Sequence, residues 1–173
     1  VERVGFEGVW EMISLPQLAI TATLQKGSDA PMNEETILRV TLPIKIAIGE
    51  LKKAKATSAQ VFEMLEFFTL AYGAAIDAAD KTKEDSAALL EERARKVHLS
   101  ATTANNVLSR MKKGRSQTCT GLEIKALDEG FTAAVELHDV LPEWAFMQAG
   151  YQLIKYGVNR NKSKRKTKRK KRR

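Results

Sequence analysis

The segment from Thr82 to Gly114 reads TKEDSAALLEERARKVHLSATTANNVLSRMKKG. Its apolar residues are separated by steps of three and four residues in strict alternation. They are Ala87, Leu90, Ala94, Val97, Ala101, Ala104, Leu108 and Met111. This spacing is typical of a long helix that packs against other helices. Thr82 suits an N-terminal cap, and Lys112, Lys113 and Gly114 suit the other end, so we expect one helix over about 83–113.

Further helices flank this stretch on both sides. The segment 57–80 begins with a capping residue and is apolar over most of a helix circumference, which predicts a helix at the centre of the core. Thr120 and Glu123 form a capping box that starts a helix reaching Leu141. Pro142 suits the first turn of a last helix, which we expect to end at Gly157. Short connections favour antiparallel neighbours.

The segment 36–42 is compatible with two structures. Its apolar and polar residues alternate as in a strand, and Thr41-Leu42-Pro43 suits the start of a helix that continues to about Lys55. Alternatively, 36–42 forms the first turns of a helix that contains Pro43. Because a proline inside a helix costs about 3 kcal/mol, we expect 36–42 to be extended or irregular.

These patterns together predict an all-α fold. We expect a bundle of four or five antiparallel helices with the long helix at its centre and a disordered basic tail after it. Residues 32–158 would form the bundle and 159–173 the tail. The loop 26–31 is followed by Met32-Asn33-Glu34-Glu35, which resembles a protein start. We therefore expect 1–31 to be an extension outside the bundle.

The net charge of +8 on the 173 residues is unevenly distributed. Between Arg160 and Arg173 there are 11 basic residues and no acidic one. Removing these 11 from the 29 basic residues leaves 18 against 21 acidic residues, so residues 1–159 carry −3. No apolar run approaches the roughly 20 residues of a membrane span. No signal-peptide pattern is present, and Cys119 has no second cysteine to pair with, so we expect a cytoplasmic protein without a membrane partner.

The tail has the composition of a segment that binds polyanions. It has no apolar residue and no aromatic ring, so it suits phosphate groups without reading base sequence. An acidic protein surface or an anionic lipid is the other class of partner for such a tail. The predicted contacts to nucleic acid are Arg160, Lys162, Lys164, Arg165, Lys166, Lys168, Arg169, Lys170, Lys171, Arg172 and Arg173.

Two segments in residues 1–159, which we call the body, are compatible with DNA-binding motifs. Residues 94–111 fit a helix-turn-helix whose recognition helix starts at Ser100, but the regular spacing continues across the expected turn and favours one helix. Residues 36–65 fit a ribbon-helix-helix in which Arg39 and Thr41 of a paired strand would face DNA. Independently of these motifs, we expect body contacts near the end of the long helix, at Asn105, Asn106, Arg110, Lys112, Lys113 and Arg115.

No pattern in the chain indicates catalysis. His98, His138 and Cys119 lack the spacing of metal ligands, and there is no phosphate-binding glycine loop or nucleophile elbow. We expect no cofactor, no metal and no enzymatic activity. Neighbouring carboxylates such as Glu91 and Glu92 point in different directions on a helix, as on a solvated face.

The spacing from Leu42-Pro43 through Leu51 and from Gly121 to Glu143 resembles small helical proteins of phage, plasmid and other mobile-element genomes, some of them described as regulators. The resemblance covers roughly residues 42–155. It implies a non-enzymatic accessory role. We therefore expect a protein that associates with DNA or RNA, with the tail on the phosphate backbone. The alternative is an assembly module that self-associates or binds a protein through the seam of the long helix, while its tail holds an acidic partner.

Overall fold

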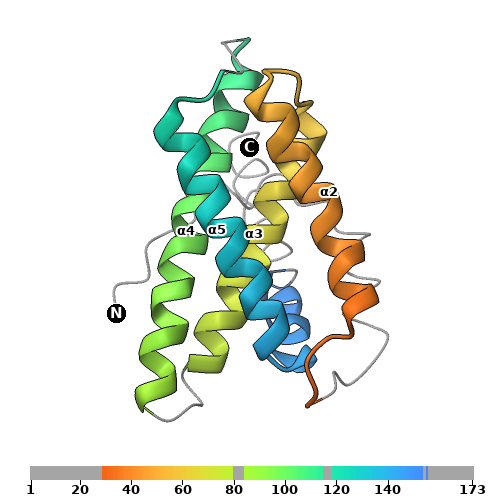
Figure 1. Cartoon of the computed structure of the whole chain (residues 1–173), viewed down its shortest axis with the longest axis vertical. Coiled ribbons are helices and arrows are strands. Elements are labelled where there is room, and N and C mark those ends of the chain that lie inside the picture. Colours follow the sequence, from red (N-terminus) through yellow and green to blue (C-terminus); the bar gives the residue numbers. More distant parts are fainter. Residues whose placement is uncertain (1–28, 80–83, 115–117, 154, 156–173) are drawn as a thin grey trace, which may run out of the picture.

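A computed structural model describes residues 29–79, 84–114, 118–153 and 155. This part of the chain contains α2 (Glu34–Lys52), α3 (Ser58–Ala79), α4 (Glu84–Lys112), α5 (Gly121–Val140) and a final helix over 143–153. The described residues form no strand, only an isolated bridge between Pro31 and Pro142. The predicted all-α bundle is confirmed (Figure 1).

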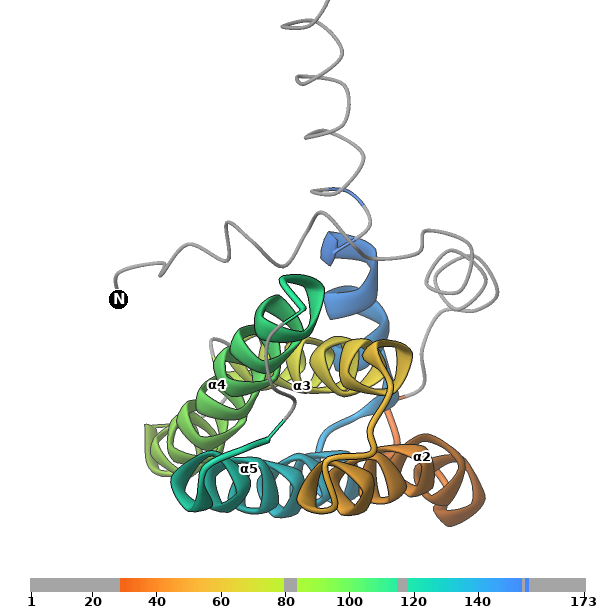
Figure 2. The same ribbon diagram turned by 90° about the horizontal axis from the view of Figure 1, so that it is seen from above.

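Successive helices of the bundle run in opposite directions (Figure 1). Helix α4 packs along α3 and α5, and α2 packs on α5 and α3. Seen from above, α2 and α5 lie on one side and α3 on the other, with α4 joining them at one edge (Figure 2). The final helix packs on α3, where a β-carbon added to Gly73 would lie 3.1 Å from Ala149 Cβ. Helix α2 therefore occupies the edge opposite α4.

Helix α4 is one continuous helix of 29 residues, about 43 Å long at 1.5 Å per residue. The seam predicted from the sequence is buried in the core at Leu90, Ala94, Val97, Ala101, Ala104 and Leu108. The helix-turn-helix alternative is wrong, because no turn interrupts the helix and Ser100 is fully buried. The Ser100 hydroxyl donates to the Ala126 carbonyl oxygen of α5 at 2.6 Å. A recognition helix starting there would have to expose that side chain.

Helix α3 lies at the centre of the core, as its nearly all-round apolar pattern predicts. Its buried residues point toward α2, α4, α5 and the final helix, and include Val61, Met64, Leu65, Phe67, Phe68, Ala71, Ala74, Ala75 and Ala78. The predicted caps also hold. Thr57 and Gln60 exchange backbone-to-side-chain hydrogen bonds before α3, and Thr120 and Glu123 form the capping box of α5.

The extended or irregular structure expected for 36–42 is wrong. These residues belong to α2, and Pro43 lies inside the helix. The cap is Asn33, whose side chain accepts from the Thr36 backbone N–H at 2.8 Å, so the helix begins before the alternating stretch. Burial of Ile44, Ile48 and Leu51 on the inner face offsets the cost of the proline. Without a strand at 36–42, the ribbon-helix-helix alternative is wrong as well.

The N-terminal extension and the C-terminal tail predicted from the sequence lie largely outside the described residues. Of the expected extension 1–31, only 29–31 are described, and there the Ala30 carbonyl oxygen accepts from the Glu143 backbone N–H at 2.9 Å. The Thr82 cap, the expected end of the last helix at Gly157 and the tail 159–173 are not among the described residues.

Candidate nucleic-acid interface

The predicted contacts of the body lie on the last turns of α4. Asn106, Lys112 and Lys113 are exposed there, while Asn105 is half-buried. Helix α4 ends at Lys112, and Gly114 follows in the turn after it. The φ of Gly114 is 65°, in the left-handed region, and its N–H donates to the Met111 carbonyl oxygen. Arg115 and all the tail residues from Arg160 to Arg173 lie outside the described part of the chain.

Arg110 is engaged within the fold. Its guanidinium donates to both carboxylate oxygens of Glu123 on α5, at 2.6 and 3.1 Å, and to the Thr118 carbonyl oxygen at 3.4 Å. The hydrogen bond from Arg110 holds the pKa of Glu123 below its usual value. Both side chains are partly buried. Arg110 therefore ties the end of α4 to the start of α5, and we remove it from the set of candidate contacts.

A second group of cations at the same end of the bundle was missed in the sequence. The turn between α2 and α3 carries Lys52, Lys53 and Lys55, all exposed. Because α2 and α4 run in the same direction, this turn and the α4–α5 connection share one end of the bundle (Figure 1). The antiparallel order of helices could have revealed this, since the first and third connections of an up-down bundle always meet at one end.

The backbone of this turn is fixed by a Schellman motif. The Lys55 N–H donates to the Glu50 carbonyl oxygen at 2.8 Å and the Ala54 N–H to the Leu51 carbonyl oxygen at 3.0 Å. Ala54 adopts a φ of 54°, where glycine is the usual residue. The lysines on either side of Ala54 are thus presented on a defined turn.

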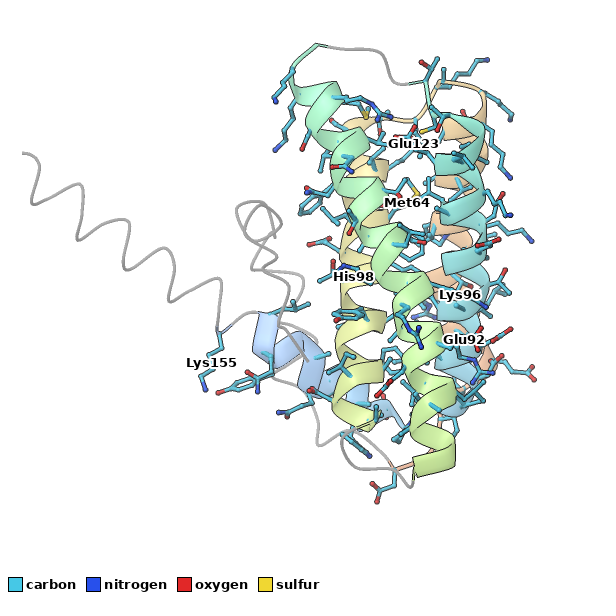
Figure 3. The ribbon with its side chains drawn as sticks, turned by 90° about the vertical axis from the view of Figure 1, so that its left-hand side faces the viewer. Met64, Glu92, Lys96, His98, Glu123 and Lys155 are labelled. Atoms are coloured by element: carbon cyan, nitrogen blue, oxygen red, sulfur yellow. The ribbon has the colours of Figure 1, made fainter. Side chains whose placement is uncertain are left out.

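Only some of the lysines at this end of the bundle form ion pairs. Lys52 pairs with Asp128 of α5 at 2.9 Å, and Lys53 pairs with Glu50 at 3.2 Å. Lys125 approaches Glu129 only to 3.7 Å. Among the described residues, Lys55 and Lys113 have no ion pair. We call this group the basic end of the body: Lys52, Lys53, Lys55, Lys112, Lys113 and Lys125. It is the end of the bundle at which Glu123 is labelled (Figure 3).

The opposite end of the bundle is acidic. Glu34 and Glu35 lie in the first turn of α2, Asp139 is exposed in the last turn of α5, and Glu143 opens the final helix. The body is therefore electrically asymmetric, and its mild net negative charge conceals a basic pole.

Two of the polar groups named in the sequence analysis, His138 and Cys119, are buried and half-buried respectively. His138 is buried between the rings of Phe67 and Phe146, at centroid distances of 5.4 and 4.2 Å. Burial lowers the pKa of His138 below its usual value. Cys119 is half-buried, and burial raises the pKa of its thiol. Within the described residues, no group of three or more His, Cys, Asp or Glu is placed to hold a metal ion.

The seam of α4 is not available to a partner, because it is buried against α3 and α5 of the same chain. The seam therefore offers no surface for the alternative, self-association through α4.

None of the described helices combines the length and the apolar character that crossing a membrane requires. No protein-family model, curated protein or solved structure matches the chain.

Proposed function

We propose that this chain is a non-enzymatic protein that associates with nucleic acid through the phosphate backbone. The observation that carries the proposal is the segregation of charge: 11 basic and no acidic residues between Arg160 and Arg173, beside a body of net charge −3. Lysine and arginine that neutralise phosphates release condensed counterions, which drives binding without regard to sequence.

The basic end of the body supports the same proposal. It offers exposed lysines on two connections that lie at one end of the bundle (Figure 1). It offers no exposed arginine fork and no aromatic ring among its members, so it suits phosphates more than base edges. We further propose that the chain is a regulator or accessory factor of a phage, plasmid or other mobile element. Only the resemblance in sequence spacing supports this part of the proposal.

Removal of the tail tests the proposal. The full chain and a 1–159 variant are titrated against duplex DNA and single-stranded RNA at about 50 mM salt, a concentration at which phosphate contacts are strong. We expect the full chain to bind both polymers and the truncation to lose most of the affinity. Circular dichroism of both proteins is the control that the bundle is intact.

The other outcomes are equally informative. A truncation that keeps a preference for one polymer would show that the body reads nucleic acid by itself. If the full chain binds neither polymer, the proposal is wrong, and an acidic protein surface becomes the partner to seek for the tail.

A further inference from the structure

Helix α2 is apolar on two faces. Its inner face is buried in the bundle at Ile44, Ile48 and Leu51. Leu38, Leu42 and Ile46 are 61%, 48% and 52% exposed, although all three are large aliphatic residues. At about 100° per residue, these three residues form a line roughly opposite the buried face. We call Leu38, Leu42 and Ile46 the outer stripe.

The outer stripe is open to a partner helix. Helix α2 stands at the edge of the bundle, beside α5 and away from α4 (Figure 2). The stripe extends over about 12 Å at 1.5 Å per residue. Gly49 continues it by one turn, and a β-carbon added there would meet nothing within 4 Å. A second helix could therefore approach closely at the glycine and cover the aliphatic side chains.

The charges on α2 select the direction of that partner. Glu35 precedes the outer stripe and Lys53 follows it, both on the same side of the helix as the stripe. These residues already pair within the chain: Glu35 and Arg39 are both exposed, while exposed Lys53 pairs with half-buried Glu50. Ion pairs this accessible to solvent are weak. An identical helix placed antiparallel brings the acidic end of one copy against the basic end of the other. A parallel arrangement would bring like charges together.

We propose that a second copy of this chain docks on the outer stripe, with the two α2 helices antiparallel about a two-fold axis. The register that places Leu42 opposite Ile46 of the second copy also places Glu35 opposite Lys53 of that copy. Symmetry repeats both contacts, which is the self-complementary pattern of a two-fold interface. Gly49 then lies opposite Arg39 and leaves room for its side chain.

The dimer is independent of the proposed function but would serve it. A pair of helices buries less than the roughly 1,600 Å² of a standard interface, so we expect dissociation in the micromolar range. The two tails of a dimer would engage one polyanion together, which raises apparent affinity through effective concentration. Failure of dimerisation would leave single-tail binding unaffected, so the two proposals are tested separately.

The first test is the mass of the full chain in solution. Sedimentation equilibrium is expected to show a monomer–dimer equilibrium, and Leu42→Glu is expected to weaken dimerisation at least about 30-fold, because a carboxylate would be buried against aliphatic side chains. Leu122→Glu on α5 is the matched control, since Leu122 is an aliphatic residue 80% exposed outside the stripe. It should leave the equilibrium unchanged, and circular dichroism should show both variants folded.

The second test exchanges charges between copies. Glu35→Lys alone and Lys53→Glu alone each place like charges opposite each other twice in a homodimer and should weaken it. A mixture of the two variants restores both opposite-charge contacts and should form heterodimers. Uniform ¹⁵N labelling of one variant separates the heterodimer from both homodimers by mass in native mass spectrometry. Homodimers and heterodimers in statistical proportion would overturn the antiparallel register.

A monomer at all concentrations up to about 100 times the expected micromolar range would overturn the proposal. The stripe would then be covered by residues 1–28 of the same chain or by a different protein. A dimer that survives Leu42→Glu unchanged would also overturn it, since another surface would hold the two copies.

Discussion

At the residue scale, the packing of α4 on α5 depends on one serine and one glycine. Ser100 of α4 is fully buried and its hydroxyl donates to Ala126 of α5. Gly130 of α5 faces it, and a β-carbon there would overlap the Ser100 hydroxyl and lie 3.0 Å from the Lys96 carbonyl oxygen. The added carbon would also lie 2.6 Å from Ser100 Cβ, so rotation of the Ser100 hydroxyl alone cannot relieve the overlap, and the site strongly favours glycine.

Gly130→Ala should therefore reduce the free energy of unfolding by about 3 kcal/mol, the upper range for overpacking a well-filled core. Gly121→Ala is the matched control, because a β-carbon at Gly121 meets nothing within 4 Å. Chemical denaturation of both variants measures the difference. Equal stability of the two would mean that α4 and α5 do not pack this closely.

Glu66 of α3 makes stability depend on pH. Burial, with the charge of Glu63 nearby, raises the pKa of Glu66 to about 7. Among the described residues, its buried Oε1 has no hydrogen-bond partner. Because the folded pKa exceeds the unfolded value, the stabilisation from the protonated form is complete below about pH 4.5 and is lost as the pH rises through 7.

Glu66→Gln should raise the free energy of unfolding at pH 8 by about 1 kcal/mol, a value reduced because the side chain is only half-buried. The gain should vanish at pH 4. Denaturation at both pH values is the measurement, with Glu91→Gln, an exposed carboxylate on α4, as the control. A gain that is the same at pH 4 and pH 8 would contradict the assignment.

At the scale of the element, α2 and α4 end in the same backbone geometry with different residues. Gly114 has a φ of 65° after α4, whereas Ala54 has a φ of 54° after α2. Alanine in the left-handed region costs about 1–2 kcal/mol relative to glycine. Alanine also lowers the entropy of the unfolded chain relative to glycine, which offsets about 0.4–1 kcal/mol of that cost.

Ala54→Gly should therefore stabilise the protein by about 0.5–1 kcal/mol, and Gly114→Ala should destabilise it by a similar amount. Thermal unfolding of the two variants, followed by circular dichroism, measures the opposite shifts. Shifts of the same sign would show that at least one of these helices ends in a different conformation.

The elements with continuous periodicity could be predicted from the sequence. The apolar positions of α4 and α3 are largely the positions that are buried, so the sequence pattern predicts both helices. The entry to α2 was misjudged, because Leu38, Val40 and Leu42 alternate as in a strand while belonging to a helix with two apolar faces. The low helix propensity of Pro43 is a local property, and it takes no account of the stabilisation from burying Ile44 and Ile48 on the inner face of α2.

At the scale of the whole molecule, only part of the candidate interface could be predicted. The charge of the tail is a property of composition, so it is visible without a structure. The engagement of Arg110 by Glu123 and the convergence of Lys55 with Lys113 at one end depend on how the helices pack. Charge pairing between helices is not encoded in local patterns, so the engagement of Arg110 required the fold. The convergence of Lys55 with Lys113 could have been inferred from the predicted antiparallel order of the helices.

The basic end should add a measurable share of polyanion binding. In the full chain, the triple variant Lys55→Gln, Lys113→Gln, Lys125→Gln should reduce the slope of log Kobs against log salt by about 2 for duplex DNA. These lysines lie outside the outer stripe, so dimerisation is not affected. Arg95→Gln, an exposed cation on the middle of α4, is the control and should leave the slope unchanged.

The proposal that this chain holds nucleic acid through its phosphates rests on the charge of the tail. The most direct test is the affinity of the full chain for a duplex of arbitrary sequence between about 50 and 200 mM salt. We predict that the affinity falls by at least about 1,000-fold over that range and is equal for a second duplex of unrelated sequence. An affinity that does not respond to salt, or no binding at the lowest salt, would contradict the account.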